Sequence, residues 1–343
     1  MTKNKNKTGT NNTKVETTDA KPKVVLRTYR DTDYEQVEYL FRSTQVPLVY
    51  ESIRSKLWAL PTWGIWFIVY SGLLISIPKA ITFCIGNLPE WAMVIIKIFI
   101  SFCWAVVGFA IIFISSDRIE IQNRVDEAMA NDLYDPDLYY LNYTINKDGK
   151  KVRKSESEQV PSHFWVLSID DEICGMIGLL CNNQDLEDRR ETVPVGWKQF
   201  IIAVLELFRL SSMPPFLEKQ RANIDPGNKN NSRRIFARKQ IPKTATITRW
   251  AIRSDLQACG LSSLLINRAI TWAHEHDINR IYAMTNECCM AAEQILTGRH
   301  GFVIMKRYNL NFFGEYNKLF ACRVKEWMEK NGEKTRAAFK KSQ

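Results

Sequence analysis

Two long segments of the chain carry no charged residue. Residues 57–78 read LWALPTWGIWFIVYSGLLISIP, and residues 98–116 read IFISFCWAVVGFAIIFISS. At about 1.5 Å of rise per residue, a helix of either length crosses a hydrocarbon core of about 30 Å. Neither segment has a polar face, which disfavours a pair of buried core helices. We expect a transmembrane hairpin over residues 57–116, and a re-entrant hairpin that dips into the bilayer without crossing it is the main alternative.

The flanking charges indicate the orientation of this hairpin. The residues before Leu57 are much more basic than the loop between the two segments, and basic flanks favour the cytosolic side. Two crossings return the chain to the same side at Asp117 and Arg118. The first apolar run starts too late for a signal peptide, and eight dispersed cysteines favour a reducing compartment. We expect an integral protein of the endoplasmic reticulum or another endomembrane, with both termini and the soluble part in the cytosol.

Positive charge is concentrated outside the apolar segments. The formal net charge is +10, residues 1–22 have the composition of a disordered basic arm, and residues 326–343 form a basic tail. Residues 218–243 hold eight basic residues against two acidic ones. No nucleic-acid recognition motif accompanies this charge, so we expect no nucleic-acid partner. Four histidines and the absence of a CxxC pair argue against a metal site.

The rest of the chain alternates between strand-like and helix-like patterns. Alternation of apolar residues predicts strands at residues 24–29, 163–169, 172–180, 244–254, 278–286, 302–308 and 316–324. Helical periodicity predicts helices after Asp33 and at residues 50–57, 117–133, 261–276 and 288–302. These patterns predict an α/β (α+β) fold with a mixed central sheet, formed by residues 23–56 and 117–325 and interrupted by the hairpin.

Residues 181–243 read as an insertion into this domain. The insertion contains one strongly apolar stretch, WKQFIIAVLELFRL, at residues 197–210. This stretch fits a helix on the membrane surface as well as a helix packed in the core, and the sequence does not decide between them.

A corner of small residues, QACGLS at 257–262, joins a predicted strand to a predicted helix. The first backbone N–H groups of a helix have no internal partner, and the helix dipole adds partial positive charge there. Small residues allow a phosphate oxygen to approach these donors closely. The corner therefore predicts an anion site, to which the Gln257 amide could contribute. Neither a GK[ST] sequence nor GxGxxG is present.

In its context the corner resembles the cofactor motif of the GNAT superfamily of N-acetyltransferases, Q/R-x-x-G-x-G/A. Gln257, Gly260 and Ser262 occupy the three marked positions, with serine as a small departure at the last one. VVLRTYRDTDYEQV resembles the first strand and helix of the family, and FWVLSIDDEICGMIGLL its second and third strands. The apolar hairpin followed by DLYDPDLYYL is similar to the membrane-bound subgroup, which includes the cysteine-S-conjugate and aspartate N-acetyltransferases.

The resemblance implies that acetyl-CoA is the co-substrate. Pyrophosphate would lie on the backbone of Ala258, Cys259, Gly260, Leu261 and Ser262. The pantetheine arm would pair with the strand that ends at Ile252 and Arg253, and the thioester would lie beside the strand at residues 280–286. A small-molecule or protein amine would attack the carbonyl directly. The implied partners are this amine acceptor and the lipid bilayer.

The sequence departs from the family in its acid and base residues. Thr297 stands near the position of the usual tyrosine acid, and Thr246 near that of a glutamate base. Glu287 is the best remaining base, Tyr308 is a weaker candidate, and Cys288 and His300 fit structural roles better. These departures keep a second interpretation open, in which the chain is a catalytically inactive, membrane-anchored binding or scaffold protein with the same fold.

Overall fold

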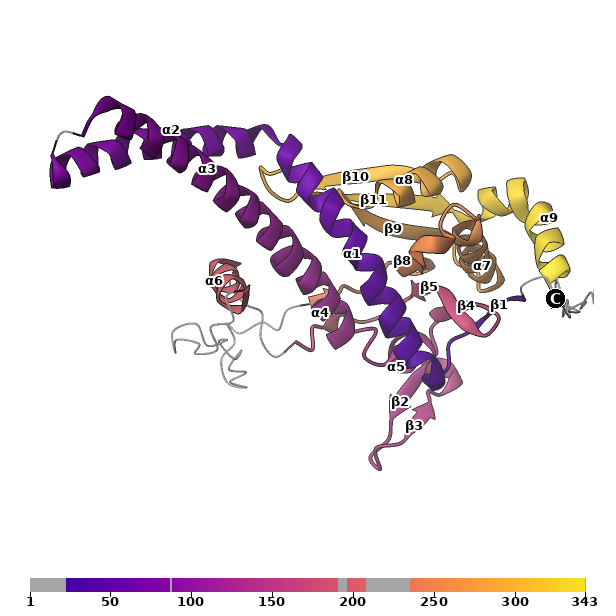
Figure 1. The fold of residues 1–343 in the computed structure, drawn as a ribbon. Helices are drawn as coiled ribbons and strands as arrows, with labels where there is room; N and C mark the ends of the chain where they lie inside the picture. The colour runs from indigo at the N-terminus through magenta and orange to yellow at the C-terminus, as the bar shows by residue number, and fades with distance from the viewer. Residues whose placement is uncertain (1–22, 87, 191–195, 208–234, 343) are drawn as a thin grey trace, which may run out of the picture.

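The computed structural model describes residues 23–86, 88–190, 196–207 and 235–342, and it shows a sheet domain from which a helical hairpin projects (Figure 1). Within these residues, seven strands form one mixed sheet in the order β1-β4-β5-β8-β9-β11-β10. Its strands are β1 (Val24–Thr28), β4 (His163–Ile169), β5 (Glu172–Leu180), β8 (Thr244–Ile252), β9 (Arg280–Asn286), β10 (Val303–Asn309) and β11 (Tyr316–Arg323). The predicted class, a mixed sheet flanked by helices and interrupted by a hairpin of two apolar helices, is confirmed.

Two small antiparallel ribbons were not predicted. They are formed by β2 (Tyr143–Ile145) with β3 (Lys151–Arg153) and by β6 (Leu186–Glu187) with β7 (Ile235–Ala237). Their strands have two or three residues each, too few for a periodic pattern to emerge.

Strand β1 links the part of the chain before the apolar hairpin to the part after it. It precedes the hairpin in the chain, whereas the other strands of the sheet follow it. β1 nevertheless pairs antiparallel with β4 over its whole length, from Val24 opposite Ile169 to Thr28 opposite Trp165. The chain on both sides of the hairpin therefore belongs to one folded domain.

Helix α1 (Tyr34–Trp58) is continuous, so the prediction of a separate helix at residues 50–57 was wrong. Its N-terminal part packs on the sheet through Val37, Leu40 and Phe41, with Pro47 accommodated inside the helix. At its other end Ser52 donates a hydrogen bond to Glu120 at 2.6 Å. Packing at both ends holds the two predicted pieces in line despite the backbone hydrogen bond that proline removes.

The hairpin consists of α2 (Leu60–Ile85) and α3 (Glu90–Ile114), both longer than the apolar runs that predicted them. The helix continues beyond α3 through a π-helical turn η2 (Ser115–Ile121) into α4 (Gln122–Ala130). Tyr70 and Ser101 hydrogen-bond across the hairpin at 2.7 Å, and a Cβ atom at Gly108 would overlap the ring of Trp66. By length and composition, both helices are able to cross a membrane.

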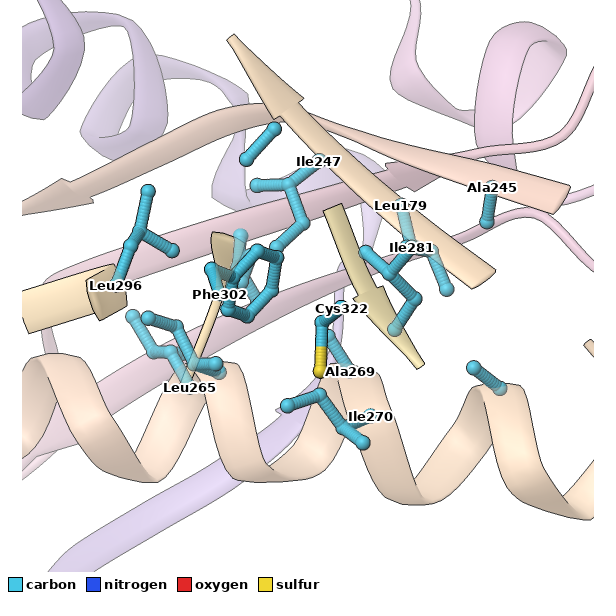
Figure 2. Packing of buried hydrophobic residues seen from close by; sticks show 14 of the residues in the cluster. Leu179, Ala245, Ile247, Leu265, Ala269, Ile270, Ile281, Leu296, Phe302 and Cys322 are labelled. Atoms are coloured by element: carbon cyan, nitrogen blue, oxygen red, sulfur yellow. The ribbon is translucent and has the colours of Figure 1, made fainter. Parts of the chain in front are cut away.

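Buried side chains cover both faces of the sheet. On one face α7 (Leu261–Glu275) contributes Leu265, Ala269 and Ile270 to a cluster with the strands, as Figure 2 shows. On the other face α1, α4 and α5 (Pro136–Tyr140) form a second cluster. Along α7, Leu265, Ile270 and Ala273 are buried, whereas Leu261 and Leu264 are half-buried in the turn at which the helix begins.

Three further helices complete the fold. The expected basic tail is part of α9 (Val324–Ser342), whose Trp327 is buried against the α7 cluster. A short helix α8 (Met290–Gln294) continues into the turn η6 (Ile295–Arg299), as predicted. The helix within the insertion, α6 (Gly196–Leu207), contacts η2 and α3 and buries Ile202 and Ala203. The predicted arm at residues 1–22 and most of the insertion's basic stretch lie outside the described residues.

Candidate functional site

The corner after β8 presents a concave row of backbone donors. A short turn η5 (Ser254–Leu256) follows the strand, and Ala258 and Gly260 then adopt left-handed conformations with φ of 64° and 81°. Within the described chain, no acceptor is recorded for the N–H groups of Ala258, Cys259 and Gly260. Those of Leu261 and Ser262 follow in the first turn of α7, where a helix supplies no acceptor. A left-handed residue next to a right-handed one, as at Gly260 and the first helical residue Leu261, aims successive N–H groups at one point, which is the geometry of an anion-binding nest.

Two polar side chains, those of Ser263 and Gln257, lie beside the nest. The buried hydroxyl of Ser263 has no hydrogen-bond partner among the described residues, and sequence reasoning missed it. The Gln257 side-chain amide donates to the Ile252 carbonyl at 3.3 Å, so this amide supports the corner from behind. A Cβ atom at Gly260 would meet nothing within 4 Å, so the surroundings of this residue are open.

Strands β8 and β9 separate halfway along their length. They pair in parallel from Thr244 opposite Arg280 to Ile247 opposite Ala283, and not beyond. At this point Thr248 is an extra residue in β8 relative to β5, that is, a β-bulge. A bulge bends its strand and increases the twist. The second half of β8 thus keeps its pairing with β5 and has an unpaired edge towards β9.

The unpaired edge belongs to particular residues. Arg253 donates its N–H to Cys174 of β5 at 2.8 Å, and backbone groups of successive residues in a strand point to alternate sides. The backbone groups of Trp250 and Ile252 therefore point towards β9. The indole N–H of Trp250 also lacks a partner in the described part of the chain. Arg253 itself is engaged, because its guanidinium pairs with Glu172 and Asp255.

A buried polar cluster supports the bulge. Asp132, which is fully buried, accepts two hydrogen bonds from the Arg249 guanidinium at 2.7 and 2.8 Å and one from the Tyr140 hydroxyl. Tyr140 also bonds to the Thr248 hydroxyl at 2.7 Å. Burial, together with the charge of Asp132, raises the pKa of Tyr140 well above its ordinary value. Sequence reasoning missed this cluster, and its one local signal was an arginine in the otherwise uncharged strand TITRWAI.

Glu287 follows β9 and is buried, not solvated at a helix start. Its carboxylate pairs with Arg124 of α4 at 3.2 Å and accepts the backbone N–H of Tyr316 at 3.2 Å. The neighbouring Cys288 thiol donates to the same carboxylate at 3.4 Å. Burial raises the pKa of Cys288 to about 12, so this thiol stays protonated near neutral pH and is a poor nucleophile. Because β8 and β9 are parallel, Glu287 lies at the same end of the sheet as the corner.

A second charged cluster lies next to Glu287, and sequence reasoning missed it as well. The Lys56 ammonium of α1 pairs with Glu120 of η2 and lies 4.0 Å from Glu315, which precedes β11. Burial, and then the adjacent Glu120 carboxylate, raise the pKa of Glu315 to about 7. The π-helical turn that carries Glu120 is a distortion that occurs frequently at functional sites.

The other sequence candidates lie away from the unpaired edge or are engaged elsewhere. The Thr246 hydroxyl accepts a hydrogen bond from Gln240, and Thr297 bonds to the backbone of Glu293 in its own helix. Tyr308 lies on β10, the outermost strand, which β11 separates from β9. His300 is buried beside Trp327, and its ring nitrogens have no partner among the described residues.

Two other features are separate from this site. The carboxylates of Asp31, Asp135 and Asp137 lie close together, but the Lys151 ammonium contacts all three at 2.7 to 3.1 Å and occupies the space between them. A cavity of about 740 Å³ borders this cluster and is lined by His163 and Trp272, among others. It opens at the N-terminal end of β4, which runs parallel to β8, and so at the opposite end of the sheet from the corner.

Comparisons with known proteins give fold-level likenesses only. No protein-family model and no curated protein matches the chain. Among solved structures it is similar to a GNAT-family acetyltransferase from Staphylococcus aureus Mu50 (10% identity, TM-score 0.37, 88% of this chain and 99% of that chain). It is also similar to the ribosomal-protein-S18-alanine N-acetyltransferase from Escherichia coli (11%, 0.28, 55% and 86%) and to a GNAT-family acetyltransferase from Elizabethkingia anophelis with acetyl-CoA bound (11%, 0.27, 48% and 76%). Identities and TM-scores this low assign no family, so function has to be inferred from the chain's own strand pairing and corner.

Proposed function

We propose that this protein is a GNAT-type N-acetyltransferase that moves an acetyl group from acetyl-CoA to a primary amine. One observation carries the proposal: the parallel strands β8 and β9 separate at the Thr248 bulge, and β8 then leads directly into a nest of free backbone donors. A phosphate fits the nest, and an extended amide-containing arm fits the free strand edge, because it pairs there as an added strand would. In acetyl-CoA the amide-containing pantetheine arm is joined to the pyrophosphate, so one molecule would fill the strand edge and the nest that follows it.

Each part of the cofactor has a counterpart in the chain. The pyrophosphate lies on the N–H groups of residues 258–262, with the Ser263 hydroxyl nearby. The pantetheine amides pair with the backbone of Trp250 and with the N–H of Ile252, whose carbonyl already accepts the Gln257 side-chain amide. Arg253 is excluded, because its N–H and its carbonyl are both engaged within the chain. The thioester reaches the level of the bulge, where a neutral amine attacks the carbonyl carbon and the thiolate leaves. Free strand-edge N–H groups are the available donors for the developing oxyanion.

Two carboxyl groups are candidates for removing the amine proton. Glu287 lies at the end of β9, but its carboxylate is already bonded to Arg124 and to the Tyr316 backbone. Glu315, which immediately precedes Tyr316, has a pKa raised to about 7, close to the operating pH that suits a general base. We retain Glu287 as the first candidate and take Glu315 as the alternative.

We further propose that α2 and α3 anchor the protein in a membrane, as in the membrane-bound subgroup that the sequence resembles. Residues such as Ile68, Phe83, Phe99 and Phe102 are more than half exposed on these helices, although they are strongly apolar. A bilayer covers such surfaces at no cost in polar desolvation. The domain then lies on the cytosolic side, where acetyl-CoA is expected.

The alternative is a catalytically inactive scaffold, which the engaged hydroxyls of Thr246 and Thr297 favour. The full-length protein in lipid nanodiscs should bind acetyl-CoA, measured by calorimetry, and release free thiol when a panel of amines is added. Binding without turnover for any amine would support the scaffold. Absence of binding would contradict both the cofactor assignment and the proposed reaction.

Replacement of the first candidate base is expected to slow the reaction without weakening cofactor binding. Glu287→Gln should lower turnover roughly 10²–10⁴-fold while acetyl-CoA affinity stays nearly unchanged. Arg124→Gln is the matched control, because it breaks the same ion pair and keeps the carboxylate. Equal losses in the two variants would assign Glu287 a structural role. Two results together would assign the general base to Glu315. Glu287→Gln would lower turnover by less than about tenfold, and the rate of a Glu315→Gln variant would no longer change with pH near 7.

The topology gives an all-or-none result. Because β1 and β4 belong to one sheet, epitope tags at residues 1 and 343 should lie on the same side of the membrane. With the domain on the cytosolic side, protease added to sealed microsomes should digest both tags. One digested and one protected tag would contradict the shared sheet.

Two exposed native cysteines then distinguish a crossing from a re-entrant hairpin. Cys84 lies near the far end of α2, and Cys259 lies in the cytosolic corner. A membrane-impermeant maleimide should label Cys259 at once and Cys84 only after permeabilisation, with Cys84→Ser and Cys259→Ser proteins identifying the bands. Immediate labelling of both would indicate a re-entrant hairpin.

A further inference from the structure

The turn between β10 and β11 exposes apolar side chains on a rigid frame. We call residues 310–314 the tip; its Leu310, Phe312 and Phe313 are 55%, 88% and 38% exposed. The Asn311 side-chain oxygen accepts the N–H of Phe313 at 2.9 Å and that of Glu315 at 3.2 Å, and Leu310 bonds to Glu315 across the turn at 2.9 Å. The tip is therefore built to present its aromatic side chains, and their exposure to water is unfavourable.

The tip lies where the soluble domain meets the apolar hairpin (Figure 1). A Cβ atom at Gly314 would lie 3.5 Å from the Ser55 side chain and 3.7 Å from Ala59, in the last turn of α1 and just after it. Glu315 continues this contact towards Lys56. Trp58 and Leu60, at the start of the apolar hairpin, are 81% and 85% exposed at the same level.

Positive charges accompany the exposed aromatic side chains. On β10 the Lys306 ammonium lies 4.7 Å from the ring centre of Tyr308, and the Arg307 guanidinium lies 4.2 Å from that of Tyr316. Neither cation has a carboxylate partner in the described part of the chain. Apolar residues at a tip, followed by tyrosines and free cations, match the layers of a bilayer surface: acyl chains, the interface and anionic headgroups.

We propose that the tip is a second membrane contact, in which Leu310 and Phe312 enter the interface of the bilayer that the hairpin occupies and Lys306 and Arg307 contact anionic lipid headgroups. The inference rests on the proposed membrane anchoring. Together, the hairpin and the tip fix the tilt of the domain relative to the membrane, which the hairpin alone leaves free. Because Tyr316 donates its N–H to Glu287, the same contact holds the end of β9, and with it the proposed reaction site, beside the headgroups.

Lipid-depth measurements on the full-length protein test this contact. An environment-sensitive fluorescent amino acid replaces Phe312 in one protein and Asp148, in the exposed turn between β2 and β3, in the control. Both proteins are placed in nanodiscs of phosphatidylcholine and phosphatidylserine, with or without bromine on the acyl chains. Emission from position 312 should shift to the blue and lose most of its intensity with brominated lipid, whereas emission from position 148 should not change. Equal behaviour at the two positions would overturn the proposal.

Three further readouts separate the remaining outcomes. Retention of the protein in carbonate-washed membranes reports on the hairpin alone, so its loss contradicts the anchoring, and retention without quenching at position 312 contradicts only the tip contact. Lys306→Glu with Arg307→Glu should weaken the quenching when phosphatidylserine is present and leave carbonate resistance intact. A blue shift at position 312 without quenching by brominated lipid, lost in nanodiscs that hold one copy, would show that a second copy, paired along β10, covers the tip, and would overturn the lipid assignment.

Discussion

Gly260→Asp is expected to abolish acetyl-CoA binding, with a loss of affinity of about a hundredfold or more. The substitution places a carboxylate at the centre of the nest, where the pyrophosphate is proposed to lie. Juxtaposed like charges cost several kcal/mol, and each 1.4 kcal/mol corresponds to about tenfold in affinity. The protein itself leaves room for the new side chain, because a Cβ atom at Gly260 would meet nothing within 4 Å.

Gly260→Asn is the matched control for this experiment. Asparagine has nearly the same size as aspartate and also tolerates the left-handed conformation that residue 260 adopts, with φ of 81°. Its affinity should stay much closer to that of the unmodified protein. Calorimetric titration with acetyl-CoA and a melting curve for each protein measure binding and folding separately. Equal affinities of the two folded variants for acetyl-CoA would contradict the proposal that the pyrophosphate binds at this corner.

Asp132→Leu is expected to lower the free energy of unfolding by about 3–5 kcal/mol. Removal of one partner of a buried ion pair leaves the other charge without compensation, and here the stranded group is the Arg249 guanidinium. The substitution also removes one partner of the Tyr140 hydroxyl, which bonds to Thr248 at the bulge. Chemical denaturation in detergent measures the loss.

The double variant Asp132→Leu with Arg249→Met tests the cause. It removes both charges and keeps apolar volume, so much of the stability should return. If the double variant is as unstable as the single one, the loss comes from packing and not from the stranded charge. Because the cluster supports the bulge, folded Asp132→Leu protein should also bind acetyl-CoA more weakly than the double variant.

The sequence predicted those elements whose signal is local. Alternation in FWVLSIDDEICGMIGLL predicted β4 and β5, and the small residues at 257–262 predicted the corner before α7. The apolar runs predicted a hairpin of two helices. Each of these signals lies within a continuous stretch of a few residues, and backbone geometry converts it directly into a strand, a turn or a helix.

The sequence failed where the structure depends on partners that are distant in the chain. The division of α1 into two helices was wrong because contacts with Glu120, 68 residues away from Ser52, hold its end in line. Glu287 was predicted as a candidate base from its place after a strand, and nothing in the sequence indicated that Arg124 and the start of β11 would enclose and engage its carboxylate.

The sequence by itself therefore determined which segments are apolar enough to leave water, where the strands of the main sheet form, and which corner exposes free backbone donors. Only the tertiary structure decided that β8 separates from β9 at Thr248, that Asp132 and Arg249 pair beneath the bulge, and that Lys56, Glu120 and Glu315 meet beside the end of β9. The physical reason is that periodicity and turn chemistry act between neighbours in the chain. The pairing of buried charges and the loss of a strand partner are instead set by which distant segments the folded sheet brings together.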